Sequence, residues 1–275
     1  MRKQHETAVL VISDLHIGKR TADYNITVAR RRLNKLAEKV CRIKEQLGNG
    51  YELDKIHVWV LGDTIDGDGI YPGQAHHQDE SNVVEQTFIA AEMLGDFLGM
   101  LGEGFPRVMV MGVPGNHGRV GRHSHEAANW DLSTYRQLEI HRKKNVRLNF
   151  PNRADRVSRT TDFIHHVNLR SHGYLLYHGH GVRSFANIPF YGLYNRALRW
   201  RTSTRLPEFC MLCCGHFHTL GKHQVNDVRL MLTGTMVTSD DWALQQLGFD
   251  SANKWWLFGV SNKYPQTWQF DLDLV

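Results

Sequence analysis

Apolar runs alternate with amphipathic stretches along the first half of the chain. Three short runs rich in β-branched residues predict buried strands, at residues 8–13, 55–61 and 107–113. Between them, apolar residues recur at three- and four-residue steps, as on one face of a helix. The helices are expected at 27–47, after Ser81 (a candidate N-cap for apolar positions from Val84 to Leu98), and at about 125–141.

The second half of the chain is rich in predicted strands. These span residues 146–148, 163–169, 174–178, 209–214, 222–225, 229–232, 255–260 and 266–272. One helical or irregular insertion, at about 188–202, interrupts them. One core of two packed sheets with helices outside explains both halves, so we expect a single domain over 1–275. A second domain stays open as an alternative, although no Pro/Gly/Ser-rich boundary favours it.

Polar motifs follow five of the predicted strands. They are Asp14-Leu15-His16, Gly62-Asp63-Thr64-Ile65-Asp66, Gly115-Asn116-His117-Gly118, His178-Gly179-His180 and Gly215-His216-Phe217-His218. Loops at the carboxyl ends of strands in an α/β sheet converge on one crevice. These motifs are therefore expected to meet there. Residues two apart can point to the same side, and a glycine before Asp63, Asn116 and His216 allows a sharp turn.

The converging side chains form a mixed set of oxygen and nitrogen donors. The set comprises Asp14, His16, Asp63, Asn116, His178, His216 and His218. Such a set suits Mn²⁺, Fe or Zn²⁺ better than Mg²⁺ or Ca²⁺, which prefer oxygen ligands. Seven ligands are too many for one ion, so two metals that share one carboxylate are expected.

Alone, Asp-x-His and Gly-Asp are weak signals and Gly-Asn-His is a turn, whereas His-Gly-His is suggestive and Gly-His-x-His is a moderate signal. Five in this order, each after an apolar strand, closely resemble the calcineurin-like metallophosphoesterases. The resemblance runs from Asp14 to His218, about three quarters of the chain. It implies an α/β fold, a four-layer α/β/β/α sandwich of two mixed sheets flanked by helices. The stand-alone size and the stretch Val-Pro-Gly-Asn-His-Gly-Arg also resemble phage- or prophage-type members.

The resemblance also implies a role for each motif residue. One metal would be held by Asp14, His16 and His218, and the other by Asn116, His178 and His216, with Asp63 shared. His117 would be the catalytic histidine and Asp66 the acid that orients it. The implied reaction is hydrolysis of a phosphoric ester by a water that two divalent metals, Mn²⁺ first, activate.

Two positions depart from the family pattern. Gly118 stands where many members carry an acidic residue, so the orientation of His117 would depend more on Asp66. Nuclease members from double-strand-break repair often carry a histidine where this chain has Asp66. An aspartate there is more like the phosphatase members, which weakens an assignment to that nuclease branch.

Residues near the motifs are candidates for binding the substrate. Arg119 and Arg122 follow His117, and His180 and Arg183 follow His178. Guanidinium groups bind phosphate in a bidentate manner, but solvated loop arginines are an equal or better explanation. The polar loop 68–79 could cover the site, with His76 and His77 expected at its surface.

The insertion at about 183–205 interleaves arginines with aromatics. They are Arg183, Phe185, Phe190, Tyr191, Tyr194, Arg196, Arg199, Trp200, Arg201 and Arg205. This pattern suits nucleic-acid backbones and bases. An amphipathic helix with aromatics in the core has at least equal weight.

Net charge and cysteine content indicate the kind of partner and the cellular compartment to expect. There are 33 Lys and Arg against 28 Asp and Glu, a formal charge of +5, which suits a phosphate-bearing partner. Three of the four cysteines crowd one segment, Cys210 to Cys214, and reduced thiols in a cytoplasmic protein are expected. No apolar run is long enough for a membrane span.

The sequence therefore favours a metal-dependent phosphodiesterase acting on DNA or RNA. A phosphatase or phosphodiesterase for a nucleotide, cyclic nucleotide or phosphoprotein is the alternative. A non-catalytic scaffold is disfavoured, because all seven candidate ligands and His117 are present.

Overall fold

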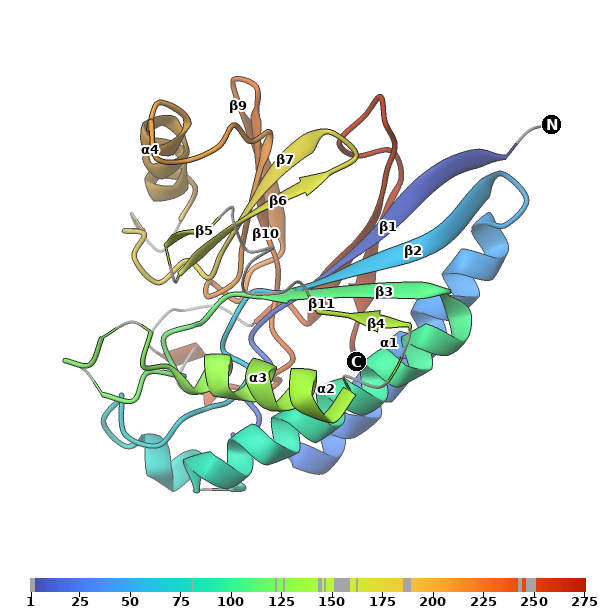
Figure 1. The fold of residues 1–275 in the computed structure, drawn as a ribbon. Coiled ribbons are helices and arrows are strands. Elements are labelled where there is room, and N and C mark those ends of the chain that lie inside the picture. Colours follow the sequence, from blue (N-terminus) through green and yellow to red (C-terminus); the bar gives the residue numbers. More distant parts are fainter. Residues whose placement is uncertain are drawn as a thin grey trace.

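Two six-stranded mixed sheets form the centre of the protein in the computed structural model (Figure 1). The structure describes residues 3–80, 82–121, 123–125, 127–142, 145, 147–150, 159–161, 163–184, 189–241, 244–245 and 251–275. The strands are β1 (Gln4–Ile12), β2 (Tyr51–Val60), β3 (Arg107–Gly112), β4 (Leu148–Asn149), β5 (Arg159–Thr161), β6 (Ile164–Leu169), β7 (His172–Tyr177), β8 (Met211–Cys214), β9 (Gly221–Val225), β10 (Val228–Leu232), β11 (Lys254–Val260) and β12 (Gln269–Asp273). The helices are α1 (Ile26–Leu47), α2 (Val83–Gly104), α3 (Trp130–Arg142), α4 (Phe190–Arg201) and the 3-10 helix η1 (Gln74–His77).

The first sheet has the strand order β12-β11-β1-β2-β3-β4. Strands β1 to β4 are parallel to one another, while β11 runs antiparallel to β1 and β12 antiparallel to β11. The carboxyl ends of β1, β2 and β3 therefore lie at one edge of this sheet. This edge receives the first three polar motifs.

The second sheet has the strand order β5-β6-β7-β8-β10-β9. Here β7, β8 and β10 are parallel neighbours, whereas β5, β6 and β9 join by antiparallel pairs. The carboxyl ends of β7 and β8 therefore also meet at one edge. This edge receives the last two polar motifs.

Alternation along the strands divides the core into three apolar layers. On β1, Ala8, Leu10 and Ile12 pack with the residues of α1 and α2, whereas Val9 and Val11 pack against the second sheet. The outer face of the second sheet packs against α4, through Leu193 and Ala197. Figure 1 shows the resulting layers, with α1, α2 and α3 on one side and α4 on the other. This arrangement confirms the four-layer α/β/β/α fold class.

Two helix starts differ from the sequence prediction. Helix α2 is capped by Asn82, whose side chain accepts a hydrogen bond from Val84 N at 3.0 Å, while Ser81, the predicted cap, lies outside the described residues. Helix α3 begins at Trp130, later than the expected 125, because the preceding residues are held in a loop by Trp130 N donating to Gly118 O at 2.6 Å. The short strand β5 was not predicted.

The four cysteines are free thiols. Cys213 faces the layer between the sheets and Cys214 the layer under α4, as alternation along β8 requires. Among the described residues, no helix is both long and apolar enough to cross a membrane.

Candidate active site

The carboxyl ends of five strands bring together the seven candidate metal ligands. Asp14 and His16 follow β1, Asp63 follows β2, Asn116 follows β3, His178 follows β7, and His216 and His218 follow β8. Among these side chains and His117, three groups have ligand atoms within 4.8 Å of one another: Asp14, His16 and His218; His16, Asp63 and His117; and Asp63, His178 and His216. Both sheets therefore contribute to one site.

The first group gathers around the imidazole of His218. Its Nε2 lies 3.2 Å from His16 Nε2 and 3.3 Å from Asp14 Oδ1. Asp14 and His16 are buried, and no described residue donates a hydrogen bond to Asp14 Oδ1. A buried carboxylate oxygen without a donor is costly, so this atom points to a cation.

The third group gathers around the imidazole of His178. Its Nδ1 donates a hydrogen bond to Leu61 O at 2.6 Å, which turns Nε2 toward the site. His178 Nε2 lies 2.9 Å from Asp63 Oδ2 and 2.8 Å from Asn116 Oδ1. Two oxygens and this ring nitrogen thus face one point.

These spacings fit a divalent metal. Two ligands about 2.1 Å from a cation and roughly 90–109° apart lie about 3.0–3.4 Å from each other. The separations above, of 2.8 to 3.3 Å, are close to this range. Asp63 belongs to two of the three groups, with His178 and His216 in one and with His16 and His117 in the other.

Five of the candidate ligands adopt left-handed backbone conformations. Asp14, His16, Asp63, His216 and His218 have φ values of 54°, 48°, 48°, 67° and 50°. Such conformations are uncommon for residues other than glycine and gather at functional sites. They aim the side chains away from the strand direction, into the space between the loops.

Gly115 and Gly215 lie beside these ligands, at positions where there is no room for a side chain. A Cβ at Gly115 would lie 2.1 Å from Asp63 Oδ1, and one at Gly215 would lie 1.8 Å from Ser13 Oγ. Any side chain at either position would push a candidate ligand or its neighbour out of place.

The carboxylates and imidazoles of the site shift one another's pKa values. Burial opposes ionisation of Asp14 and Asp63, but the neighbouring imidazoles hold the pKa of both carboxyls below the usual range. Burial likewise lowers the pKa of His16 and His178, but the carboxylates outweigh it and raise these values to about 10 and about 9. Since a ligating nitrogen must be unprotonated, a metal would compete with protons here.

His117 lies beside the candidate metal ligands, and residues of the Asp66 loop contact its Nδ1. Its Nδ1 donates to Asp66 O at 2.8 Å, and the Asp66 carboxylate lies farther away, at 3.5 Å. Gln74 Nε2 is 3.2 Å from the same nitrogen. The backbone of Asp66 therefore contacts His117 more closely than the side chain named by the sequence. The Asp66 carboxylate also lies 3.3 Å from His16 Nδ1.

Tyr71, in the loop after Asp66, was not singled out by the sequence. Its hydroxyl accepts from Asn116 Nδ2 at 2.8 Å, which turns the Asn116 oxygen toward His178. Its ring lies 4.9 Å from the ring of His117. The loop therefore covers the site with Tyr71 and Gln74, while His76 and His77 are exposed, as expected.

Asp131 was also not predicted, although it connects two of the loops. Its buried carboxylate accepts from Asp63 N at 3.0 Å, Thr64 N at 3.0 Å and Gly115 N at 2.7 Å. A Cβ at Gly118 would lie 2.4 Å from Asn129 Oδ1 and 3.0 Å from Asp131 Cγ. The acidic residue that many family members carry at this position would not fit here.

The four candidate substrate-binding residues have different settings. Arg119 and His180 are partly buried, and His180 lies against His178 and His216. Arg183 is exposed, and within the described part of the chain its side chain forms no hydrogen bond or ion pair with the candidate ligands. Arg122 lies outside the described residues.

The arginine-aromatic insertion forms helix α4. Leu193 and Ala197 are buried, and Phe190 and Trp200 pack against the same core, as in an amphipathic helix. Tyr191 and Tyr194 remain exposed, by 70% and 38%. The helix therefore has a core face, as the amphipathic interpretation predicts, and an exposed face that carries Tyr191 and Tyr194.

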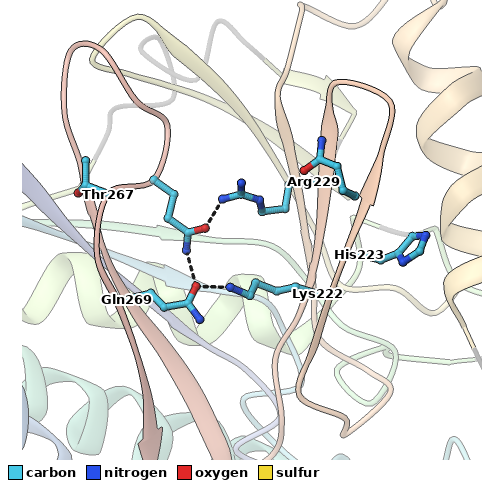
Figure 2. A pocket seen from close by; sticks show the side chains of 7 residues that line it. Lys222, His223, Arg229, Thr267 and Gln269 are labelled. Atoms are coloured by element: carbon cyan, nitrogen blue, oxygen red, sulfur yellow. Dashed lines mark hydrogen bonds between the residues drawn. The ribbon is translucent and has the colours of Figure 1, made fainter.

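A groove of about 540 Å³ lies elsewhere, between the β9–β10 hairpin and the chain before β12 (Figure 2). Lys222 donates to Gln269 Oε1 and Arg229 to Gln266 Oε1 across it. Gln266 in turn donates to Gln269 at 2.9 Å. The cations of this groove already have partners, and none of the candidate ligands lines it.

Comparison with known proteins gives structural matches only. No family model and no curated protein match the chain. Among solved structures, it is similar to Vps29 complexed with zinc from Entamoeba histolytica, at 13% identity over 98% of this chain and 99% of that chain, with a TM-score of 0.40. A predicted phosphoesterase from Streptococcus pneumoniae matches at 11% identity over 99% of both chains, with a TM-score of 0.35. An archaeal phosphodiesterase matches at 10% identity over 96% and 99%, with a TM-score of 0.41. Likeness at this level carries no information about activity.

Proposed function

We propose that this chain is a calcineurin-like metallophosphoesterase, a divalent-metal-dependent hydrolase of phosphodiester bonds, with nucleic acid as its substrate. The observation that carries the proposal is the set of three overlapping donor groups, of which two include Asp63 and one includes His117. Asp14, His16 and His218 would hold one metal, and Asn116, His178 and His216 the other. Mn²⁺ is the first choice, with Fe or Zn²⁺ as alternatives.

The metals and the protein would divide the chemistry. Divalent ions bound there would lower the pKa of a water and neutralise phosphate oxygens. His117 would supply a proton to the leaving oxygen. Its Nδ1 is engaged by Asp66 O, which leaves Nε2 to face the substrate, and its side chain keeps 19% of its surface exposed. From the covering loop, the Tyr71 hydroxyl accepts a hydrogen bond from Asn116, and Gln74 donates to Asp66 O, the carbonyl that also accepts from His117 Nδ1.

Two features support nucleic acid as the substrate. The chain has a formal charge of +5, which favours a polyanion. Helix α4 presents exposed Tyr191 and Tyr194 near several arginines, a combination that binds single strands by stacking and charge. A nucleotide-sized ester is the second candidate, because Asp66 is the residue typical of phosphatase members.

The test is hydrolysis of bis(p-nitrophenyl) phosphate beside labelled single- and double-stranded DNA, with Mn²⁺ and with chelator. We expect Mn²⁺-dependent cleavage of the generic ester and of DNA. His117→Ala should lower kcat by about 10²–10⁴-fold, the usual contribution of a general acid. Metal content, measured by plasma mass spectrometry, should not change. His125→Ala, at an exposed histidine of a nearby loop, is the matched control.

The outcomes separate the candidates. Cleavage of the generic ester without DNA would leave a phosphoesterase for a small substrate and reject nucleic acid. Metal binding without hydrolysis of either substrate would reject catalysis and favour a scaffold. Loss of metal in His117→Ala would mean that this residue is a ligand.

A further inference from the structure

Tyr71 of the covering loop contacts a candidate metal ligand directly. Its hydroxyl accepts a hydrogen bond from Asn116 Nδ2 at 2.8 Å. Tyr71 is 40% exposed, whereas Asn116 is only 2% exposed. An exposed loop residue therefore supplies the partner of a buried amide within the candidate site.

The amide of Asn116 has two ends, and only the oxygen can bind a metal. Asn116 Oδ1 lies 2.8 Å from His178 Nε2, and Asp63 Oδ2 lies 2.9 Å from the same nitrogen. The NH2 end only donates hydrogen bonds. Rotation about the last side-chain bond exchanges the two ends, and this torsion has a broad, nearly two-fold energy profile. A reversed amide would aim its NH2 group at the Asp63 carboxylate and would compete with a cation.

The Tyr71 hydroxyl makes the oxygen-in orientation favourable. Within the described part of the chain, the Asn116 amide forms hydrogen bonds with Tyr71 and His178. When the oxygen faces the site, the buried NH2 group needs an acceptor, and the hydroxyl is that acceptor. A buried donor without a partner is costly, so removal of the hydroxyl should disfavour the orientation that binds metal.

The position of this hydroxyl depends on the conformation of the loop. Gln74 Oε1 accepts hydrogen bonds from Ile70 N at 3.1 Å and from Tyr71 N at 3.2 Å. Farther along, Gln78 Nε2 donates to Asp66 Oδ2 at 3.2 Å. The residues at 68–69 and 72–73 are exposed. The loop is therefore fastened by its glutamines, and Tyr71 connects it to the Asn116 amide.

We propose that Tyr71 is a positioning residue through which the covering loop sets the affinity of the site for the metal on the Asn116 side. This inference rests on the proposed function for the presence of a metal, but not for the substrate. Coupling between two equilibria is reciprocal. A metal held by Asn116 should therefore stabilise the closed loop by the same factor by which the closed loop strengthens metal binding.

The first test is Mn²⁺ binding to the wild type and to Tyr71→Phe, followed by the electron paramagnetic resonance signal of free Mn²⁺. Phenylalanine keeps the ring that lies 4.9 Å from the ring of His117 and removes the hydroxyl alone. One Kd should rise by about 10–100-fold, the usual effect of losing a group that orients a ligand, while the other stays within about threefold. Tyr264→Phe, at an exposed tyrosine outside the site, is the matched control. Two unchanged Kd values in Tyr71→Phe would overturn the proposal.

A second background tests whether the hydroxyl acts through the amide. Asn116→Asp replaces the NH2 group with an oxygen, so no buried donor then needs the hydroxyl as its acceptor. Adding Tyr71→Phe to Asn116→Asp should cost no Mn²⁺ affinity. An equal loss of affinity in both backgrounds would mean that the hydroxyl does not act by orienting Asn116, and would reject the proposal.

Hydrogen exchange measures the reciprocal effect on the loop. Mass spectrometry of a peptide over residues 68–79 should show exchange slowed about tenfold or more by Mn²⁺ in the wild type, and by less than about twofold in Tyr71→Phe. A hydroxyl with a merely structural role would change exchange equally with and without metal. Equal slowing by Mn²⁺ in both proteins would therefore overturn the coupling.

The failure of this inference differs from the failure of the proposed function. Hydrolysis with normal Mn²⁺ affinity in Tyr71→Phe would reject the role of Tyr71 and leave the hydrolase in place. Mn²⁺ binding that depends on Tyr71, without hydrolysis of DNA or bis(p-nitrophenyl) phosphate, would reject the hydrolase and support the role of Tyr71. A wild type that binds no divalent metal would overturn both.

Discussion

A single buried carboxylate, that of Asp131, holds the backbone of two loops that carry candidate ligands. It accepts hydrogen bonds from the loop of Asp63 and from Gly115, one residue before Asn116. Burial, followed by the charge of Asp63, raises its pKa. In the sequence, Asp131 is only an acidic residue in the first turn of a helix, a common preference. Its role depends on contacts with residues far away in the chain, so sequence pattern could not reveal it.

Asp131→Asn should destabilise the fold. An amide has one oxygen where the carboxylate has two, so at least one buried backbone N–H loses its acceptor. The expected loss is about 1–3 kcal/mol in the free energy of unfolding, measured by urea denaturation. Asp68→Asn, at an exposed position of the covering loop, should change stability little. Equal stability of Asp131→Asn and the wild type would show that the loops do not depend on this carboxylate.

At the scale of elements, the hydrophobic pattern predicts most of the fold. Helix α1 spans Ile26–Leu47, against 27–47 from the apolar periodicity, because its buried face is continuous. Helix α3 begins five residues late, because Trp130 and the residues before it form hydrogen bonds across a loop. Motifs at strand ends predict that the seven candidate ligands lie together, because the directions of the strands bring them to one place. The contacts of Tyr71 and Gln74 could not be predicted, because the sequence of an irregular loop has no periodicity that shows which way its side chains point.

The start of α2 gives a prediction at this scale. Asn82 caps the helix by accepting from Val84 N, which otherwise has no partner within the helix. Asn82→Ala should therefore lower the free energy of unfolding by about 1 kcal/mol. Thermal unfolding followed by circular dichroism should show a Tm lower by about 2–4 °C. Asn82→Ser, which keeps an acceptor, should lie near the wild type; a serine variant as unstable as the alanine variant would argue against capping.

Across the whole molecule, the site depends on both sheets being packed together. The layer between them is apolar but includes His57 on β2, a residue that shares the strand face of Trp59 and is buried. Burial, and then the charge of Lys55, lowers the pKa of His57 to about 3. A neutral imidazole is thus part of the core that joins the two halves of the site.

This histidine makes the fold sensitive to acid. In the unfolded chain, His57 takes up a proton near its usual pKa of about 6.5, whereas in the native protein it stays neutral until about pH 3. Stability contributed by neutral His57 is therefore present above pH 6.5 and is lost as the pH falls toward 3. Between pH 7 and pH 5 the loss should be about 2 kcal/mol.

Urea denaturation at the two pH values measures this loss. His57→Gln should reduce the difference between pH 7 and pH 5 by that amount, whatever its effect on stability at pH 7. His125→Gln, at an exposed position, should leave the difference unchanged. An unaltered pH dependence in His57→Gln would place the acid sensitivity in other groups.

The antiparallel insertion of β11 between β12 and β1 has a consequence for synthesis on the ribosome. Thr7 of β1 pairs with Val260 of β11, so most of the sequence must be translated before this pairing can form. Until then, β1 of the nascent chain can pair with β2 along one edge, while the backbone groups of its other edge have no partner strand. An open, apolar strand edge is prone to pair with other chains. The protein should therefore depend on chaperones while it is made, and contacts between such distant residues should make its final folding step slow.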